Sequence, residues 1–233
     1  CVLPLEMPND ICPPGHYCPE GSNVSQPCPA GTNSTSMGLT KISQCLPCTA
    51  GYYCPTNGTI NATALCPQGY FCPAGTNNYT LECPTGSYCE TGSAFPVSCP
   101  AGKYQNKTTQ YDCETCPTKY YCEINTTEPV ACPEGSYCPE GTRYSNEYLC
   151  PNGTYNPYTL IGNELDCTPC SPGMYCASPG LIEPTGKCRE GYYCGGGSAV
   201  PMPHESSHSD GTESSYTGDS CVLPLEMPND ICP

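Results

Sequence analysis

Large apolar side chains are scarce in this chain. Tryptophan is absent, phenylalanine occurs twice, and Leu, Ile, Val and Phe together make up about 12% of the 233 residues. A chain with so little apolar material does not normally collapse around a hydrophobic core. The scarcity argues against an ordinary globular enzyme, and it requires another source of stability to offset the entropy lost on folding.

Positive charge is also scarce, and no long apolar run occurs. Seven Lys and Arg stand against 22 Asp and Glu, for a net charge of −15. We therefore expect no nucleic-acid partner, because the phosphate backbone would be repelled. No apolar stretch reaches membrane-spanning length, so we expect no membrane span. The chain opens on Cys1 without a signal peptide, as expected of mature or excised material.

Cysteine, in contrast, is abundant. The chain has 25 cysteines, close to 11% of its residues, a level typical of disulfide scaffolds in secreted proteins. A bridge that closes a loop of about 10 residues stabilises the fold by roughly 2.5 to 3 kcal/mol in the chain-entropy model. We predict a secreted or extracellular-surface protein that unfolds when its disulfides are reduced.

A seven-residue element, Cys-x-x-Gly-x-aromatic-Cys, recurs eight times. Its copies span 12–18, 48–54, 66–72, 83–89, 116–122, 132–138, 170–176 and 188–194. The opening Cys-Pro-x-Gly of four copies predicts a type I turn with glycine in the fourth position. Lys119 replaces this glycine in one copy, so we expect a local distortion there if the backbone requires a positive φ.

Each copy carries an aromatic residue before its second cysteine. These residues are Tyr17, Tyr53, Phe71, Tyr88, Tyr121, Tyr137, Tyr175 and Tyr193. We predict that they pack over neighbouring disulfides and turns as a minimal core. A stripe of aromatic rings that stacks on a ligand is the alternative.

A second element begins with a lone Cys-Pro-x-Gly and ends in Cys-x-x-Cys. Its three copies start at Cys28, Cys99 and Cys150 and close at Cys45/Cys48, Cys113/Cys116 and Cys167/Cys170. Because most gaps between cysteines are short, we expect local contacts and an elongated string in which each unit touches chiefly its neighbours.

The pattern C-x-x-C-P-x-G-x-Y-C resembles the ephrin-receptor-like cysteine-rich repeats of extracellular proteins. It is seen in CETCPTKYYC at 113–122 and, with Thr in place of Pro, in CLPCTAGYYC at 45–54. The repeats of tumour-necrosis-factor receptors are a looser match. The resemblance covers nearly all of 12–194 and implies small disulfide-rich repeats of short β-hairpins and turns, with little or no helix. It implies no single function, because such repeats serve receptors, adhesins and fibres alike.

We divide the chain into six segments on this basis. They are a junction with the first cysteine-rich module (1–45), further cysteine-rich modules (46–113, 114–167 and 168–194), a Gly/Ser/acidic segment without cysteine (195–220) and the start of a next repeat (221–233).

The first thirteen residues, CVLPLEMPNDICP, recur identically at 221–233. Self-similarity at a fixed period is the signature of repeat architectures. We predict that the chain is one 220-residue period, plus an overlap, of a longer tandem array, with copies of itself as its partners. A single terminal duplication is the alternative.

Cysteine parity adds a separate observation. Residues 1–220 contain 23 cysteines, an odd number. Eight elements and three opener-and-closer pairs would use all but Cys1, which is equivalent to Cys221. We predict an intermolecular bridge through this cysteine. Spacing does not determine disulfide connectivity, so a different local pairing is an equal alternative.

Eight N-x-S/T sequons lie in the loops between cysteines. Their asparagines are Asn23, Asn33, Asn57, Asn61, Asn78, Asn106, Asn125 and Asn152. In a secreted chain these are acceptors for N-linked glycans. We therefore expect covalent N-glycans around the protein.

The segment 195–220 contains a literal H-E-x-x-H string, His204, Glu205 and His208. Zinc peptidases need this string on a helix, so that both imidazoles lie on one face. Pro201 and Pro203 precede the string and residues 209–211, Ser-Asp-Gly, follow it, which leaves barely one helical turn without an apolar face. Structural disulfides are also favoured over zinc ribbons or redox sites at the Cys-x-x-Cys pairs. We expect no metal, no cofactor and no catalytic residue.

Three functions remain open from the sequence. The duplicated ends, the sequons and the odd cysteine favour a structural repeat unit of an extracellular N-glycosylated filament or surface coat. The alternative is a receptor or adhesin ectodomain that presents a protein- or glycan-binding surface. A zinc metallopeptidase, resting on HESSH alone, is the minor alternative.

Overall fold

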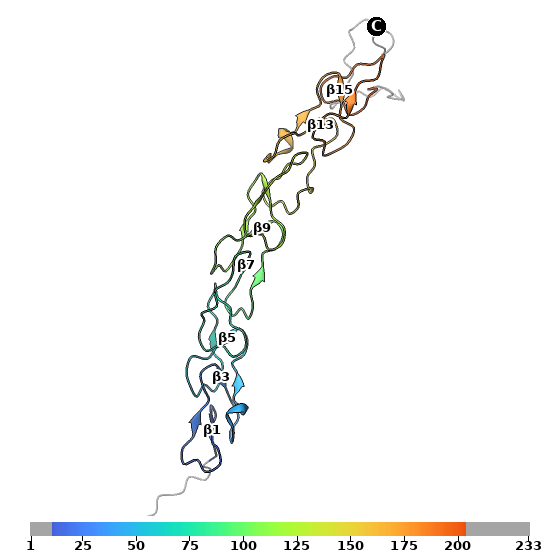
Figure 1. Cartoon of the computed structure of the whole chain (residues 1–233). Helices are drawn as coiled ribbons and strands as arrows, with labels where there is room; N and C mark the ends of the chain where they lie inside the picture. Colours follow the sequence, from blue (N-terminus) through green and yellow to red (C-terminus); the bar gives the residue numbers. More distant parts are fainter. Residues whose placement is uncertain (1–10, 204–233) are drawn as a thin grey trace, which may run out of the picture. The chain divides into compact units, whose positions relative to one another are not determined.

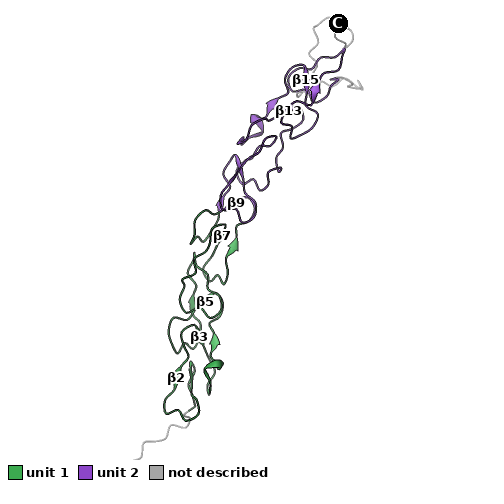
Figure 2. Ribbon diagram, viewed as in Figure 1, with its two compact units in different colours: residues 1–99, 105–113 green, residues 100–104, 114–233 purple. Residues whose placement is uncertain are grey.

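The computed structural model describes residues 11–203, which form two compact units (Figure 2). Within this range, unit 1 comprises residues 11–99 and 105–113, and unit 2 comprises residues 100–104 and 114–203. The two units are built from the same kind of structure, and each is described by itself.

Eight two-stranded antiparallel hairpins make up the regular structure of the described residues (Figure 1). In unit 1 they pair β1 (His16–Tyr17) with β2 (Gln26–Pro27), β3 (Thr32–Asn33) with β4 (Leu46–Pro47), β5 (Tyr52–Tyr53) with β6 (Ala64–Leu65), and β7 (Ser87–Tyr88) with β8 (Val97–Ser98). In unit 2 they pair β9 (Lys103–Tyr104) with β10 (Glu114–Thr115), β11 (Tyr120–Tyr121) with β12 (Val130–Ala131), β13 (Thr154–Tyr155) with β14 (Thr168–Pro169), and β15 (Met174–Tyr175) with β16 (Gly186–Lys187). Two short 3₁₀ turns, η1 (Ile42–Gln44) and η2 (Glu164–Asp166), complete the elements. The predicted fold class, disulfide-rich hairpin repeats with little helix, is confirmed.

Eleven disulfides staple these hairpins. Eight of them close the seven-residue elements, each from its first to its last cysteine, as between Cys12 and Cys18. The other three join Cys28 to Cys45, Cys99 to Cys113 and Cys150 to Cys167. These eleven disulfides are the pairs counted in the sequence analysis, eight within the seven-residue elements and three between an opening and a closing cysteine.

Sulfur forms the core of both units. Twenty of the 22 paired cysteines are buried, and Leu39 is the one other large apolar side chain that is buried among the described residues. Leu39 packs with Cys28, Cys45 and the ring of Tyr17. The disulfides thus take the place of the missing aliphatic side chains.

The structure contains eleven modules of one kind, and we name each module by its opening cysteine. Four positions recur in every module: the opening cysteine, a first turn residue three positions later, a closing position six positions later, and a second turn residue. In the Cys48 module these are Cys48, Gly51, Cys54 and Gly58. The modules open at Cys12, Cys28, Cys48, Cys66, Cys83, Cys99, Cys116, Cys132, Cys150, Cys170 and Cys188.

The turn that follows each opening cysteine lies one residue later than predicted. In the Cys12 module the N–H of His16 donates to the carbonyl of Pro13, and Gly15 between them has a φ of 76°. The turn therefore starts at proline and carries glycine in its third position, where a type II turn requires a positive φ. The type I turn expected from the sequence is wrong because it placed the glycine fourth.

Lys119 adopts the same left-handed conformation as the glycines it replaces. Its φ is 77°, its N–H donates to the Cys138 carbonyl at 2.7 Å, and its carbonyl accepts from the Cys132 N–H at 2.9 Å. The backbone does require a positive φ here, as the sequence analysis considered. The expected distortion does not occur, because the turn keeps both of its hydrogen bonds. Thr109, Asn125 and Leu160 likewise occupy second turn positions with φ near 60°.

Two backbone hydrogen bonds join the first turn residue of each module to the next module. The N–H of Gly51 donates to the carbonyl of Cys72 at 2.8 Å, and the N–H of Cys66 donates to the carbonyl of Gly51 at 2.9 Å. The turn glycine is thereby paired on both of its backbone groups. This pairing recurs at every step from the Cys12 module to the Cys188 module.

Two further hydrogen bonds complete each step. The N–H of Gly75 donates to the carbonyl of Cys48, and the N–H of Cys54 donates to the carbonyl of Thr76. All four bonds are present in five successive steps of unit 1 and four successive steps of unit 2. Each unit is therefore a ladder in which every module is bonded to the next, the arrangement of a solenoid.

The modules that open at Cys28, Cys99 and Cys150 belong to the same series. Their closing positions hold Ser34, Gln105 and Asn156, and the carbonyls of these residues accept from Gly15, Gly86 and Gly135, as the carbonyls of closing cysteines do elsewhere. All three polar side chains are buried. What the sequence presented as a second kind of element is thus the common module with its closing cysteine replaced.

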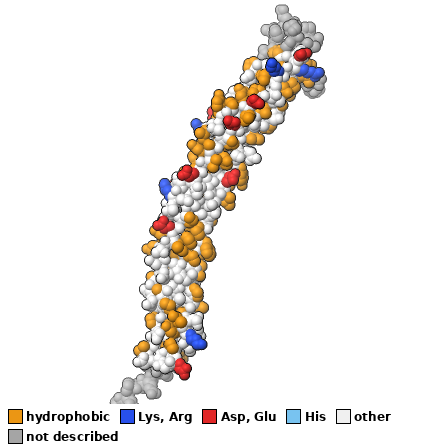
Figure 3. Space-filling model, viewed as in Figure 1, with side chains coloured by type: hydrophobic (Ala, Val, Ile, Leu, Met, Phe, Trp, Pro, Cys, Tyr) orange, Lys and Arg blue, Asp and Glu red, His pale blue; other side chains and the backbone are white. Residues whose placement is uncertain are grey.

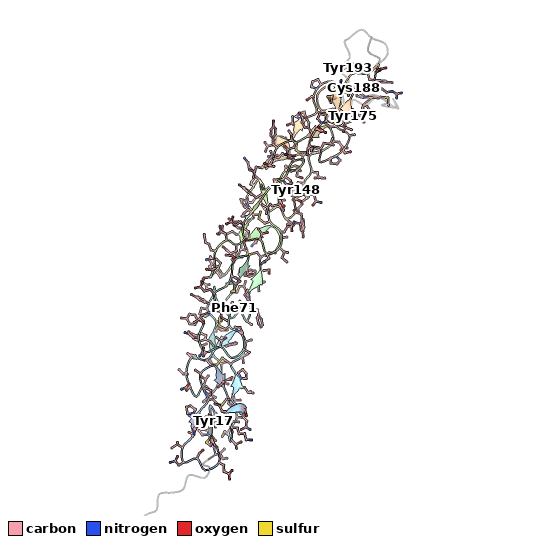
Figure 4. The ribbon with its side chains drawn as sticks, viewed as in Figure 1. Tyr17, Phe71, Tyr148, Tyr175, Cys188 and Tyr193 are labelled. Carbon is pink, nitrogen blue, oxygen red and sulfur yellow. A yellow bond between two sulfur atoms is a disulfide. The ribbon has the colours of Figure 1, made fainter. Side chains whose placement is uncertain are left out.

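The eight predicted core aromatics are all half-buried. Tyr17 and Phe71 are labelled in unit 1, and Tyr175 and Tyr193 in unit 2 (Figure 4). The ring of Tyr175 lies over Gly186 of the paired strand β16, because a Cβ added to Gly186 would meet its Cε1 at 3.3 Å. The rings cover hairpins and disulfides without forming a continuous core.

Candidate functional site

The sequon asparagines occupy exposed loops of both units, with one exception. Seven of the eight are exposed, and only Asn33, in β3, is half-buried. The Nδ2 of Asn33 donates to the carbonyl of Ile60 at 3.4 Å, so a glycan on this nitrogen would displace that contact. At Asn57 the Oδ1 accepts from the N–H of Ala30, so the side chain is held through its oxygen.

Asn125 is a sequon residue that also holds a second turn position. Its φ is 61°, a left-handed conformation that asparagine tolerates better than most residues. Its side chain is exposed. The turn therefore presents this asparagine to solvent.

A shallow pocket of about 430 Å³ lies in unit 1. It is lined by Gln68, Glu90, Thr91, Tyr111 and Asp112, which are all exposed to solvent. Tyr111 supplies the one large apolar surface, whereas binding sites for small molecules are mostly apolar. The two carboxylates lie in water, and the sequence singled out none of these five residues because they share no motif.

Tyrosine and carboxylate side chains pair at two places in unit 2. The Tyr104 hydroxyl donates to Oε2 of Glu114 at 3.0 Å across the β9–β10 pair, and the Tyr137 hydroxyl donates to Oε2 of Glu164 at 3.3 Å. Partial burial, followed by the neighbouring carboxylate, raises the pKa of both phenols above the usual value near 10. These phenols stay protonated at neutral pH, and they act as hydrogen-bond donors.

Arg143 and Glu147 form an ion pair in the loop of the Cys132 module. Nε and an Nη of Arg143 donate to Oε1 of Glu147 at 2.9 and 2.6 Å, and the Arg143 N–H donates to Oε2 at 2.7 Å. These hydrogen bonds lower the pKa of Glu147 from its ordinary value. The three hydrogen bonds of the pair hold the loop.

Three groups of predicted site residues lie outside the described range. They are the weak metal candidates His204, Glu205 and His208, the candidate intermolecular cysteines Cys1 and Cys221, and the overlap 221–233. Between residues 11 and 203, no cluster of three or more His, Cys, Asp or Glu is arranged to hold a metal ion.

None of the helices in residues 11–203 is long and apolar enough to cross a bilayer. Hydrophobic side chains are spread along the visible face of each unit among a few charged ones (Figure 3). The exposed surface thus offers scattered apolar side chains and polar loops.

The geometry defines a disulfide-rich β-hairpin repeat protein. Its eleven disulfides are those of an oxidising compartment, as in secreted and extracellular proteins. No protein-family model matches the chain, and a search of characterised proteins found no match.

Proposed function

We propose that this chain is a structural repeat unit of an extracellular, N-glycosylated filament or surface coat. The observation that supports it most strongly is the four-bond step, repeated with little change from module to module in each unit. A module that bonds to the next module by the same contacts can be extended without a new kind of interface. We also propose that its modules are related to the ephrin-receptor-like cysteine-rich repeats, which the cysteine pattern resembles.

The duplication of residues 1–13 at 221–233 extends the argument to the parent polypeptide. We propose that the 220-residue period recurs in tandem, because the duplicated stretch includes Cys232, the counterpart of the opening cysteine Cys12. The exposed sequons supply a glycan coat. The role needs no catalytic group, and we propose that the protein is not an enzyme.

Electron microscopy and mass analysis of the native protein test this function. We expect regular threads in micrographs, an intact mass several times that of one 24.7 kDa unit, and a mobility shift on removal of N-glycans. Discrete soluble particles of a single unit, with or without glycans, would contradict the filament.

A receptor or adhesin is the second candidate, and the polar pocket of unit 1 favours it. Gln68, Glu90, Thr91 and Asp112 offer hydrogen-bonding groups beside the ring of Tyr111. A glycan array probed with the whole protein tests this function. A selective signal that Tyr111→Ala removes would favour the adhesin over the filament.

A further inference from the structure

The ladder ends at the Cys188 module with four backbone groups that have no partner among the described residues. They are the carbonyl of Cys188, the N–H and carbonyl of Gly191, and the N–H of Cys194. In every inner module except the Cys99 module, the same four positions carry the bonds to the following module. We call the surface with these four groups the open face of the Cys188 module, because no module follows it within residues 11–203.

The Cys12 module presents the complementary set. The N–H of Cys12, the carbonyl of Cys18, the N–H of Gly21 and the carbonyl of Ser22 also have no backbone partner between residues 11 and 203. In inner modules other than the Cys116 module, these four positions bond to the preceding module. Each donor of one end corresponds to an acceptor of the other.

Burial of the disulfides marks the same two ends independently. Cys18 and Cys188 are the two paired cysteines that are not buried. The inner cysteines are covered by the neighbouring module on each side, and most of them are fully buried. Cys188, labelled in Figure 4, thus lies on a surface that an inner module would have covered.

We propose that the open face of the Cys188 module binds the Cys12 module of a second copy of this chain, and so continues the ladder across the junction. The inference rests on the proposed filament, and it names the contact that would build it. The four expected hydrogen bonds run from Gly191 N–H to the Cys18 carbonyl, from Cys12 N–H to the Gly191 carbonyl, from Gly21 N–H to the Cys188 carbonyl, and from Cys194 N–H to the Ser22 carbonyl.

Two glycines at this end fit the same continuation. A Cβ added to Gly31 would lie 2.6 Å from the carbonyl oxygen of Gly75, two modules further along, whereas a Cβ added to Gly173 or Gly191 meets no described atom within 4 Å. Continuing the ladder would place Gly21 of the second copy against Gly173, and Gly38 against Gly191.

The contact is head-to-tail, because it joins two different surfaces of the chain. Each copy uses one end to bind and leaves the other end free, and in the proposed filament this contact repeats without closing into a ring. Unpaired backbone groups at the edge of a hairpin array are also a known template for pairing with another chain. We assign a second copy as the partner because each of the four unpaired groups of the Cys188 module has a complementary donor or acceptor on the Cys12 module.

Sedimentation equilibrium of the whole protein, after covalent dimers are removed by size exclusion, tests the proposal. We expect reversible self-association, with a dissociation constant that Gly191→Ala or Gly173→Ala raises at least about tenfold, because each new Cβ would overlap a carbonyl of the second copy. Amide exchange should show Gly21 and Gly191 unprotected when dilute and protected when associated.

Gly75→Ala is the matched control. Gly75 has a φ of 86°, the same as Gly191, and its added Cβ would meet only Pro47 at 3.8 Å. It therefore carries equal backbone strain without touching either end, and its association should equal that of the unaltered protein. A dissociation constant that Gly191→Ala and Gly173→Ala leave unchanged would overturn the proposed junction, as would a protein that remains monomeric up to about 1 mM.

The outcome is separable from that of the filament itself. If native material shows threads and the glycine variants associate normally, the filament stands and this junction is wrong. If native material shows only single particles, the filament fails whatever the variants do.

Discussion

Eight modules close on their own seven-residue disulfide, and three do not, yet both kinds make the same two bonds from the first turn residue to the next module. In the Cys150 module the closing position holds Asn156, whose carbonyl accepts from Gly135 and whose N–H donates to the carbonyl of Leu181. In the Cys48 module Cys54 makes the equivalent bonds. The backbone ladder is therefore the constant feature, and the disulfide at the closing position is one of two ways to support it.

The three exceptional modules replace the disulfide with a buried polar side chain and a longer ring. The Nδ2 of Asn156 donates to the carbonyls of Ser136 and Tyr158, and its Oδ1 accepts from the Tyr158 N–H at 2.9 Å. The opening cysteine then pairs 17 positions later, with Cys167. Hydrogen bonds hold the start of the loop, while sulfur closes its far end.

The largest expected effect is the loss of a long-ring disulfide. Replacing Cys150 and Cys167 by alanine should lower the free energy of unfolding by about 3 kcal/mol, and replacing Cys132 and Cys138 should lower it by about 2.4 kcal/mol, because a longer ring restricts the unfolded chain more. Urea unfolding without reductant measures both. An inverted order would show that packing around the sulfur atoms outweighs ring size.

Asn156→Ala comes next, with an expected cost of about 2 kcal/mol. The change leaves the buried Ser136 carbonyl and the Tyr158 N–H without their partner, and unpaired buried groups are costly. Amide exchange at Tyr158 should accelerate. The exposed Asn146→Ala is the control and should cost less than about 0.5 kcal/mol. Equal exchange in the two variants would mean that the side chain does not support the loop.

Leu160→Gly should stabilise its module by about 1 kcal/mol. Leu160 holds a second turn position with a φ of 62°, which is strained for a branched residue and free of strain for glycine. Leu165, 89% exposed in η2, supplies the control, because glycine there should destabilise slightly. Thermal unfolding of both variants distinguishes backbone strain from loss of a side chain.

The smallest expected effect concerns the loop of the Cys132 module, which an ion pair holds in place of a second disulfide. Glu147→Gln should cost at most about 1 kcal/mol at neutral pH, because Arg143 is well exposed. The pKa of Glu147 is lowered in the fold, so its contribution is present above the unfolded value near 4.5 and is lost as the pH falls through the folded value. The variant and the parent should therefore converge in acid, whereas the exposed Glu140→Gln should cost less than about 0.5 kcal/mol at neutral pH.

Cysteine spacing predicted much of this structure, because each disulfide requires a cysteine at both of the positions that it joins. The eight short rings and the near absence of helix follow from it. The sequence did not reveal that the Cys28, Cys99 and Cys150 modules belong to the same series. Their closing positions hold three different residues, Ser34, Gln105 and Asn156, although each lies six residues after an opening cysteine. Glycine at the two turn positions was the available signal, and Lys119, Thr109, Asn125 and Leu160 interrupt it.

The ladder itself could not be predicted, because its bonds join main-chain groups and select no side chain apart from the turn glycines. The pocket of unit 1 also has no motif, since its five residues come from three separate loops. The unpaired backbone groups of the Cys12 and Cys188 modules could not be predicted either. Only the folded structure shows which amides and carbonyls lack a backbone partner among the described residues.

Every disulfide in residues 11–203 closes within one module, so no covalent cross-link other than the main chain connects a module to its neighbour. Under tension the steps between modules would part while each stapled ring stays shut. A pulled unit would therefore lengthen in small increments, one module at a time, and recover its bonds on release.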